Sequence, residues 1–286
     1  MGKDTFFCKK KTLQFRGELK ELKQPWVMGI LNVTPDSFYD GGRYKSLNDI
    51  VNNVQKMLSE GAVIIDIGAV SSKPGTDLVS KELEISRLKP VFEILSREFP
   101  QAWFSIDTFR SEVAKIAVEE FGFYMINDIS AGKLDSKMFD EVEKLNVPYV
   151  MMHMKGEPNN MQLNPTYNEI TNDILLYFSG CVKELNRRGV SDIIIDPGFG
   201  FGKTLEHNYK LLKELPAFEI LNVPILVGIS RKSMIYKLLN VTPNESLNGT
   251  TVAQTIALLN GADILRVHDV SQAMEAIKMV GFYKST

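Results

Sequence analysis

Hydrogen-bonding side chains recur in this sequence directly after short apolar segments. The residues in such positions are Asn32, Asp66, Asp107, Asn127, His153, Asp196, Lys232 and Arg266. A single aspartate in such a position is usually a helix cap or a turn former. Eight polar side chains that all lie at or just beyond the same end of these segments are better explained by a shared site, where loops meet over a rigid edge.

The residue types in this set favour a particular kind of ligand. The carboxylates of Asp107 and Asp196 accept hydrogen bonds, while the amide of Asn127 both donates and accepts. Such groups suit a flat heterocycle with several N–H and C=O edges. Buried carboxylates also stabilise positive charge that develops on a ring during a reaction.

Cationic side chains and a glycine-rich loop extend this interpretation. The cations come from three separate segments, as Lys73, Lys232 and Arg266. Three cations at one rim favour a phosphorylated or pyrophosphorylated substrate. The loop DPGFGFGKT lacks the spacing of a Walker or dinucleotide motif. Its glycines either let the backbone approach a ligand or simply form tight turns, and Phe199 and Phe201 can pack against an aromatic ring.

The sequence does not support a metal centre built from protein side chains, or an activated nucleophile. His153, His207 and His268 lack the spacing of metal ligands, and no cysteine accompanies them. GISRKS is not a GxSxG motif, and Cys181 falls within an apolar helical stripe. A diphosphate near Asn32 and the acidic groups would instead suit Mg²⁺ held mainly by water and phosphate.

Alternating strand-like and helix-like segments position these residues. Eight apolar segments are predicted as strands, at 26–32, 62–68, 102–108, 123–128, 147–153, 192–198, 223–230 and 262–269. Amphipathic segments predict helices at 47–60, 81–97, 111–121, 134–145, 167–188, 205–215, 231–239, 247–260 and 271–281. Strands covered on both faces occur in open doubly wound sheets and in closed barrels. Eight of them without an interposed domain favour a single α/β fold, the (β/α)8 TIM barrel.

Composition and the N-terminal segment complete the outline. We expect residues 1–24 to form a β-hairpin that packs on one end of the barrel, and residues 25–286 to form the barrel domain. A formal charge of -2 argues against nucleic-acid binding. The apolar segments are too short for membrane spans, the N-terminus lacks a secretory signal, and the two cysteines form no disulfide framework. These features predict a cytoplasmic protein.

Taken together, the motifs resemble those of the dihydropteroate synthase family. In order along the chain, they are MGILNVTPDSF with DGG, DIG followed by SKPG, SIDT, INDISAG, MMHMKGEP, DPGFGFGK, GISRKS and RVHDV. That family joins a pterin carrying a methyl diphosphate to p-aminobenzoate, with release of pyrophosphate and formation of 7,8-dihydropteroate. The resemblance therefore implies a pterin-binding barrel that uses Mg²⁺, acts on these two small-molecule substrates and forms a homodimer.

The resemblance also implies a role for each matching residue. The pterin would be bound by Asp107, Asn127, Ile129, Met152, Asp196, Gly228, Lys232 and Arg266. The diphosphate would be bound by Asn32, Ser72, Lys73, Arg266 and His268, with Asn32 beside Mg²⁺. The p-aminobenzoate would lie against Phe38, Phe201, Lys203, Ser230 and Arg231. The catalytic set would be Asp107, Asn32, Lys232, Arg266 and His268.

One departure from the family pattern and two alternative functions bear on this interpretation. The chain has SSKPG where the family usually has STRPG, and Lys73 cannot reproduce a bidentate guanidinium contact, so we expect a looser diphosphate contact there. A pterin-binding methyltransferase barrel would share the Asp and Asn contacts without needing the SRK and RVHD cations. A catalytically silent paralogue would have lost Lys232, Arg231 or the loop phenylalanines, which are all present.

Overall fold

The computed structural model describes residues 11–15, 17–33, 39–40, 43–44, 47–70, 79–156, 161 and 165–286, and the structural statements below refer to these residues. Eight parallel strands form one sheet in the order β10-β9-β8-β7-β6-β3-β12-β11. Their bounds are β3 (Trp26–Asn32), β6 (Ile64–Gly68), β7 (Trp103–Asp107), β8 (Met125–Asp128), β9 (Tyr149–Met152), β10 (Ile193–Asp196), β11 (Leu226–Val227) and β12 (Ile264–Val267). A single parallel bridge between Ile195 and Ile225 joins the two edges of the sheet, so the predicted barrel is confirmed.

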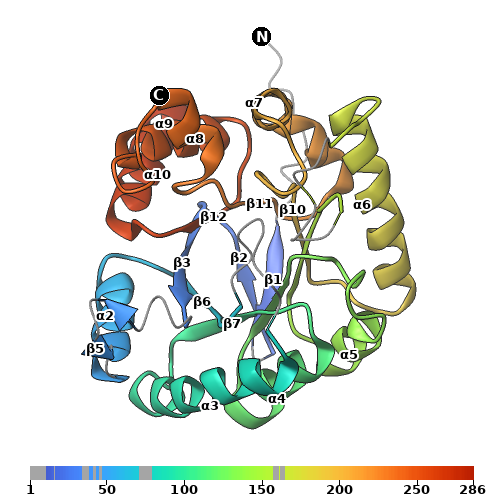
Figure 1. Ribbon diagram of the computed structural model, residues 1–286. Helices are drawn as coiled ribbons and strands as arrows, with labels where there is room; N and C mark the ends of the chain where they lie inside the picture. Colours follow the sequence, from blue (N-terminus) through green and yellow to red (C-terminus); the bar gives the residue numbers. More distant parts are fainter. Residues whose placement is uncertain are drawn as a thin grey trace.

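Helices surround the strands on the outside (Figure 1). They are α2 (Leu47–Ser59), α3 (Lys81–Glu98), α4 (Ser111–Phe121), α5 (Met138–Leu145), α6 (Ile170–Arg187), α7 (Leu205–Lys213), the 3-10 helix η1 (Leu215–Leu221), α8 (Ser233–Leu239), α9 (Leu247–Leu259) and α10 (Val270–Ser285). Two antiparallel pairs accompany them, β1 (Thr12–Phe15) with β2 (Glu18–Glu21) and β4 (Tyr39–Asp40) with β5 (Arg43–Tyr44). Within the described ranges, no helix has both the length and the apolar composition needed to cross a membrane.

Several elements are shorter than their sequence patterns predict, and for β11 and α5 the physical reason is visible. Strand β11 covers only two residues of the predicted 223–230, because Pro224 has no N–H to donate and the chain turns soon after Val227, where Lys232 N donates to Ile229 O. Helix α5 begins at Met138 rather than at 134. The Asp135 side chain accepts from the backbone of Lys137, which favours a turn before the helix starts.

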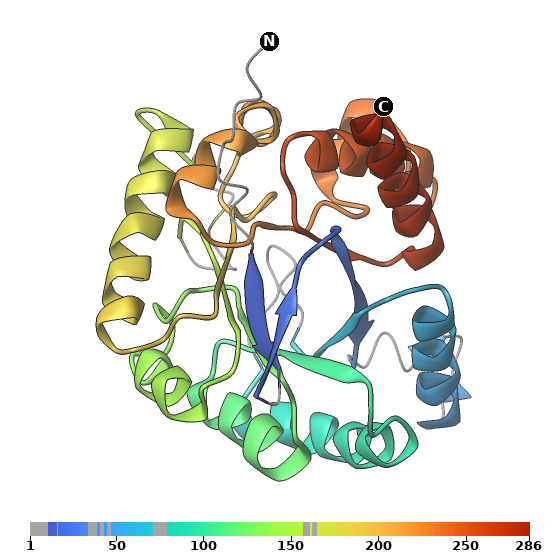
Figure 2. The same cartoon turned by 180° about the vertical axis from the view of Figure 1, so that it is seen from behind.

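The N-terminal hairpin covers the end of the barrel at which the strands begin (Figures 1 and 2). Gly17, at a φ of 79°, provides the left-handed residue that the turn requires. Leu13 and Phe15 of β1 are buried, and the Phe15 ring stacks on Trp103 with ring centroids 4.2 Å apart. Trp26 and Trp103 are the first residues of their strands, so the opposite end of the barrel remains available for a site.

The barrel interior changes from apolar to polar along the strands. Near the hairpin it is filled by Met28, Ile64, Met125, Val150, Ile194, Leu226 and Ile264. Because side chains alternate faces along a strand, the residue two positions later faces the same interior. Those later positions are occupied by Ile30, Asp66, Asn127, Met152, Asp196, Gly228 and Arg266. The strand geometry therefore collects four of the eight predicted polar residues, Asp66, Asn127, Asp196 and Arg266, above a solid apolar layer.

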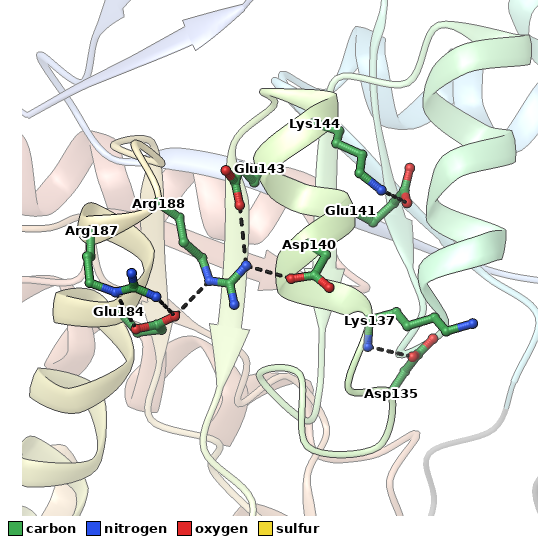
Figure 3. Close-up of polar contacts among 9 residues, drawn as sticks. All are labelled: Asp135, Lys137, Asp140, Glu141, Glu143, Lys144, Glu184, Arg187 and Arg188. Atoms are coloured by element: carbon green, nitrogen blue, oxygen red, sulfur yellow. Dashed lines mark hydrogen bonds and ion pairs between the residues drawn. The ribbon is translucent and has the colours of Figure 1, made fainter.

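An ion-pair network links two helices on the outer surface (Figure 3). Arg188, which follows α6, donates to Asp140 of α5 at 2.6 Å and to Glu184 at 2.8 Å, and it lies 3.3 Å from Glu143. Arg187 also donates to Glu184. Exposed pairs of this kind are screened by solvent, so the network connects the two neighbouring helices but adds little to the stability of the fold.

Candidate active site

A guanidinium held between two carboxylates lies where the strands end. Arg266 of β12 donates from Nε to Asp66 Oδ2 of β6 at 2.6 Å, and from Nη2 to Asp107 Oδ2 of β7 at 2.6 Å. Asn127 of β8 donates from Nδ2 to the same Asp66 oxygen at 2.8 Å. Four strands thus contribute to one charged network, and each contact is charge-assisted.

Asp107 has an unusual acid strength in this network. Burial raises the pKa of its carboxyl to about 7, while Arg266 lowers this pKa and the charge on Asp66 raises it further. The Asp107 carboxylate therefore exchanges its proton close to neutral pH. Ionised, it is a partly buried negative charge that can face positive charge on a bound ring.

The absence of a side chain at Gly228 leaves a space the size of about one methyl group among three of the predicted residues. A Cβ atom at this position would lie 3.7 Å from Asp196 Oδ2, 3.8 Å from Lys232 Nζ and 3.9 Å from Arg266 Cβ. These are ordinary contact distances, so the three side chains border the space next to Gly228. We call this space the Gly228 hollow.

Lys232 and Asp196 form the charged wall of the Gly228 hollow. Burial lowers the pKa of the Lys232 ammonium to about 8, an effect that the nearby Asp196 opposes. Burial raises the pKa of Asp196, while Lys232 and the backbone N–H of Gly198 lower it. Lys232 Nζ donates to Phe199 O at 2.6 Å, so the ammonium is held against the loop that follows β10. The Lys232 ammonium, a donor, and the Asp196 carboxylate, an acceptor, therefore both face the Gly228 hollow.

The DPGFGFGK loop packs tightly against the chain that leaves β9. A Cβ atom on Gly198, at a φ of 72°, would lie only 2.0 Å from His153 O. A Cβ atom on Gly202, at a φ of 62°, would lie 2.4 Å from Lys155 O. Both distances fall well below van der Waals contact with backbone atoms, so glycine is required at both positions. These two glycines allow the loop backbone to pack directly on the backbone of the segment that leaves β9.

Lys203 lies beneath this loop and is only 3% exposed. Its ammonium donates to Gly198 O at 2.9 Å, to Phe201 O at 3.0 Å and to His153 O at 3.3 Å. Burial lowers the pKa of Lys203 to about 7, and Asp196 opposes this effect. The structure therefore places Lys203 where it holds the loop backbone, instead of at an open surface.

An apolar cluster adjoins the charged wall. It brings together Ile129, Met152 and Phe201, which the sequence predicts as site residues, with Phe109, Met154 and Met161. Lys232 Nζ lies 4.6 Å from the centre of the Phe201 ring, within the range of a cation–π contact. Charged and apolar surfaces therefore meet at Phe201.

Ser230 and His268 are neighbours, whereas the Arg231 side chain is bound to the protein itself. Ser230 Oγ accepts from His268 N at 3.2 Å and lies 3.1 Å from His268 Nδ1. The Arg231 guanidinium donates from Nε and Nη2 to the Asp269 carboxylate at 2.9 and 2.7 Å, and from Nη1 to Asn244 at 3.2 Å. Arg231 thus joins the loop after β11 to the start of α10.

The remaining predicted residues lie at the rim or outside the described residues. Asn32 ends β3, is exposed, and pairs in register with Gly68 of β6. Phe38, Ser72 and Lys73 fall outside the described residues, as does the SSKPG segment. Across the described ranges, no group of three or more histidine, cysteine or acidic residues could hold a metal ion. The carboxamide of Asn32 is an exposed oxygen ligand that suits a hard cation which keeps most of its waters.

Asp66, one of the polar residues predicted at the strand ends, is central to the network, although no role in substrate binding or catalysis was predicted for it. It ends no strand, because β6 continues to Gly68, where a Cβ atom would lie 3.1 Å from Asp107 Cβ. The spacing that places the Asp66 side chain inside the barrel was nevertheless present in the sequence. Asp66 lies two residues after the inward-facing Ile64, the same spacing that relates Asn127 to Met125.

Comparisons with known proteins agree with this site. Residues 28–268 match the family described as pterin binding enzyme. The dihydropteroate synthase of Escherichia coli (strain K12) is 42% identical over 267 residues, which are 93% of this chain and 94% of that protein. The solved structure of the Yersinia pestis dihydropteroate synthase with a sulfonamide drug superposes with a TM-score of 0.90 at 41% identity, covering 96% of this chain and 100% of that chain.

A further solved structure bears on the second substrate. The Xanthomonas albilineans dihydropteroate synthase with 4-aminobenzoic acid has a TM-score of 0.89 and 36% identity, covering 97% of this chain and 99% of that chain. Relatives and solved structures of this similarity extend over nearly the whole chain, including every strand of the barrel. The chain therefore belongs to the dihydropteroate synthase family of pterin-binding enzymes.

Proposed function

We propose that the chain condenses 6-hydroxymethyl-7,8-dihydropterin diphosphate with p-aminobenzoate, giving 7,8-dihydropteroate and pyrophosphate. The observation that carries this proposal is the Arg266 network beside the Gly228 hollow. It presents carboxylates, an amide and an ammonium to one small space. These groups match the hydrogen-bonding edges of a pterin and the positive charge of its methylene cation.

The pterin would lie against the Gly228 hollow, where the missing side chain lets one edge of the ring approach the backbone. Asp196 and Asn127 would bind its polar edges, and Lys232 would donate to its carbonyl or ring nitrogen. Arg266 would lie against the ring. The apolar surface of Ile129 and Met152 supports a flat ligand at this place, because both side chains belong to the cluster that adjoins the charged wall.

The diphosphate would lie toward the rim. We propose that it is bound by Asn32, Ser72, Lys73, Arg266 and His268. Bound through the Asn32 carboxamide, Mg²⁺ would neutralise part of the charge of the leaving diphosphate. The exposed position of Asn32 at the end of β3 supports this assignment, since a hydrated cation needs open space.

The proposed reaction is dissociative. The bond between the pterin methylene carbon and the diphosphate oxygen breaks first, and its electron pair leaves with pyrophosphate. The Asp107 carboxylate stabilises the cation that remains. The amine nitrogen of p-aminobenzoate then attacks the methylene carbon and loses a proton to solvent, so no covalent enzyme intermediate is required.

The second substrate would bind beside Phe201 and Ser230. Phe201 borders the charged wall through its contact with Lys232, and Ser230 lies beside His268. Lys203 would act on p-aminobenzoate indirectly, by holding the loop that carries Phe201. Arg231 would act in a similar way through its ion pair with Asp269, and Phe38 would complete this part of the site.

The direct test is an assay with both substrates. Purified protein given the pterin diphosphate, p-aminobenzoate and Mg²⁺ is expected to form dihydropteroate and pyrophosphate in equal amounts. Omitting p-aminobenzoate should abolish dihydropteroate, and chelating Mg²⁺ should slow the release of pyrophosphate. Absence of dihydropteroate from the complete mixture would contradict the proposal, and methyl transfer from a methylated folate would support the methyltransferase alternative instead.

We also propose that the chain forms a homodimer through α9 and α10, and that it acts in the cytoplasm. Large apolar side chains are exposed along these two helices, at Val252, Ile256, Leu259, Met279, Phe282 and Tyr283. The helices lie side by side at the C-terminal end of the chain (Figure 1). A second copy would cover this face and remove its apolar area from water.

Light scattering tests the dimer. The protein is expected to have roughly twice the 32.2 kDa mass of the chain. Val252→Glu combined with Phe282→Glu should give monomers, because two charges would be buried in the interface. Leu176→Glu is the matched control, since Leu176 is an exposed leucine on α6, away from α9 and α10. A monomeric parent protein, or dimers in the double variant, would contradict the proposed interface.

A further inference from the structure

We infer that Asp66 is a positioning residue for the reaction, because one oxygen of its carboxylate orients both Arg266 and Asn127 toward the pterin. This inference rests on the proposed function and assigns a role to a group that does not touch the substrate. Asp66 is fully buried in the middle of β6, beneath the rim on which the proposed substrate contacts lie.

The contacts of Asp66 decide which atom of Asn127 faces the ligand. An ionised carboxylate can only accept hydrogen bonds, so Asn127 must direct its Nδ2 toward Asp66. The amide oxygen of Asn127 is then left as an acceptor. Without Asp66 the amide could rotate and present either group. Asp66 therefore selects a ligand that offers an N–H to Asn127.

The same oxygen sets the direction of the Arg266 guanidinium. Nε is bound to Asp66 and Nη2 to Asp107, so the planar group cannot rotate about its last bond without losing one of these contacts. Among the described residues, Nη1 has no hydrogen-bond partner, which leaves its N–H groups for a ligand. Asp66 thus holds the cation in place while Asp107 remains close to the reacting ring.

A purely structural role does not explain the other oxygen of Asp66. Within the described part of the chain, Asp66 Oδ1 and the Ser105 Oγ next to it in register are buried without hydrogen-bond partners. A buried polar atom without a partner destabilises the folded state, because it has given up its hydrogen bonds to water. A core selected for stability alone would place an apolar side chain here, as it does one layer below at Ile64.

The charge of Asp66 gives the inference a specific readout. Five charged groups act on Asp107 or respond to its charge, namely Arg266 of β12, Asp66 of β6, Glu84 of α3, Asp128 of β8 and Lys232 before α8. Glu84 is bound to Arg110, and Asp128 to Tyr149, so both keep their positions when residue 66 changes. Removing the charge of Asp66 should lower the pKa of Asp107, because a like charge disappears and Arg266 remains.

Asp66→Asn tests the inference, because it keeps the shape and one accepting oxygen while removing the charge. We expect the pKa of Asp107, followed by NMR titration of its carboxyl carbon, to fall by roughly one unit. The acidic limb of the pH profile of kcat/KM should move in the same direction. Asp66→Ala removes the acceptor as well, and should weaken pterin binding in calorimetry by roughly ten- to a hundredfold.

Asp263→Asn is the matched control. Asp263 is a largely buried aspartate just before β12, at the opposite end of the strand from Arg266, where it binds Lys11 and the Ile225 N–H. This variant should lower the melting temperature while leaving the pKa of Asp107 and the pterin affinity unchanged. If Asp66→Asn also changes only the melting temperature, Asp66 is structural and the inference is wrong. The NMR titration needs no turnover, so it separates this failure from failure of the proposed function, which the parent assay reports.

Discussion

Asp107→Asn is expected to lower kcat roughly a hundred- to a thousandfold, the usual cost of losing a group that stabilises transition-state charge. Pterin affinity should change by less than about tenfold, because the amide keeps the shape of the side chain and an oxygen that can accept from Arg266. Single-turnover kinetics give the rate of the chemical step, and calorimetry with the pterin gives the affinity. The effect should therefore lie in kcat.

The pH profile strengthens this test. Since burial raises the pKa of Asp107 to about 7, and the ionised form is the stabilising one, kcat/KM of the unmodified protein should decline as the pH falls below this value. The limb due to Asp107 should disappear in Asp107→Asn. Asp140→Asn, on the surface of α5, should leave both rate and profile as they were. An unchanged kcat in Asp107→Asn would exclude the charge-stabilising role.

Lys232→Met is expected to weaken pterin binding roughly ten- to a hundredfold. The substitution removes the donor beside the Gly228 hollow. It also removes the cation that lowers the pKa of Asp196 most, so the pKa of that carboxyl rises further. Because burial lowers the pKa of Lys232 to about 8, the affinity of the unmodified protein should also decline as the pH rises beyond 8. Calorimetry across this pH range measures both effects.

The neighbouring helix offers a control for Lys232→Met. Lys237 is exposed in the last turn of α8, so Lys237→Met makes the same chemical change five residues away without reaching the hollow. It should bind the pterin as tightly as the unmodified protein does. Pterin affinity retained in Lys232→Met would remove this residue from the site.

The sequence predicted the barrel and the part of the site that strand geometry determines. Asp107, Asn127, Asp196 and Arg266 lie together because each occupies an inward position near the end of a parallel strand. Apolar runs with polar ends reveal such positions directly. The helix pattern outside the barrel was equally informative, since each amphipathic stripe packs on the sheet.

Side-chain direction in the loops could not be predicted in the same way. Lys203 is next to the glycine-rich loop in sequence, but the fold turns its ammonium inward to three carbonyl groups. The partner of Arg231 is Asp269, 38 residues away, and no local pattern relates the two. Such contacts depend on tertiary packing. The roles of Phe38, Ser72 and Lys73 remain predictions from family resemblance.

The join between β10 and β11, the two edges of the sheet, relates the proposed substrate binding to the integrity of the fold. Strand β11 is two residues long, and within the described residues a single β-bridge, between Ile195 and Ile225, pairs its side of the sheet with β10. Asp196 lies on one side of this join, and Gly228 with Lys232 on the other. If Asp196 and Lys232 bind the pterin as proposed, the pterin spans this seam of the barrel and acts as a cross-link. By thermodynamic linkage, whatever opens that seam weakens binding, and occupancy in turn holds the two edges of the sheet together.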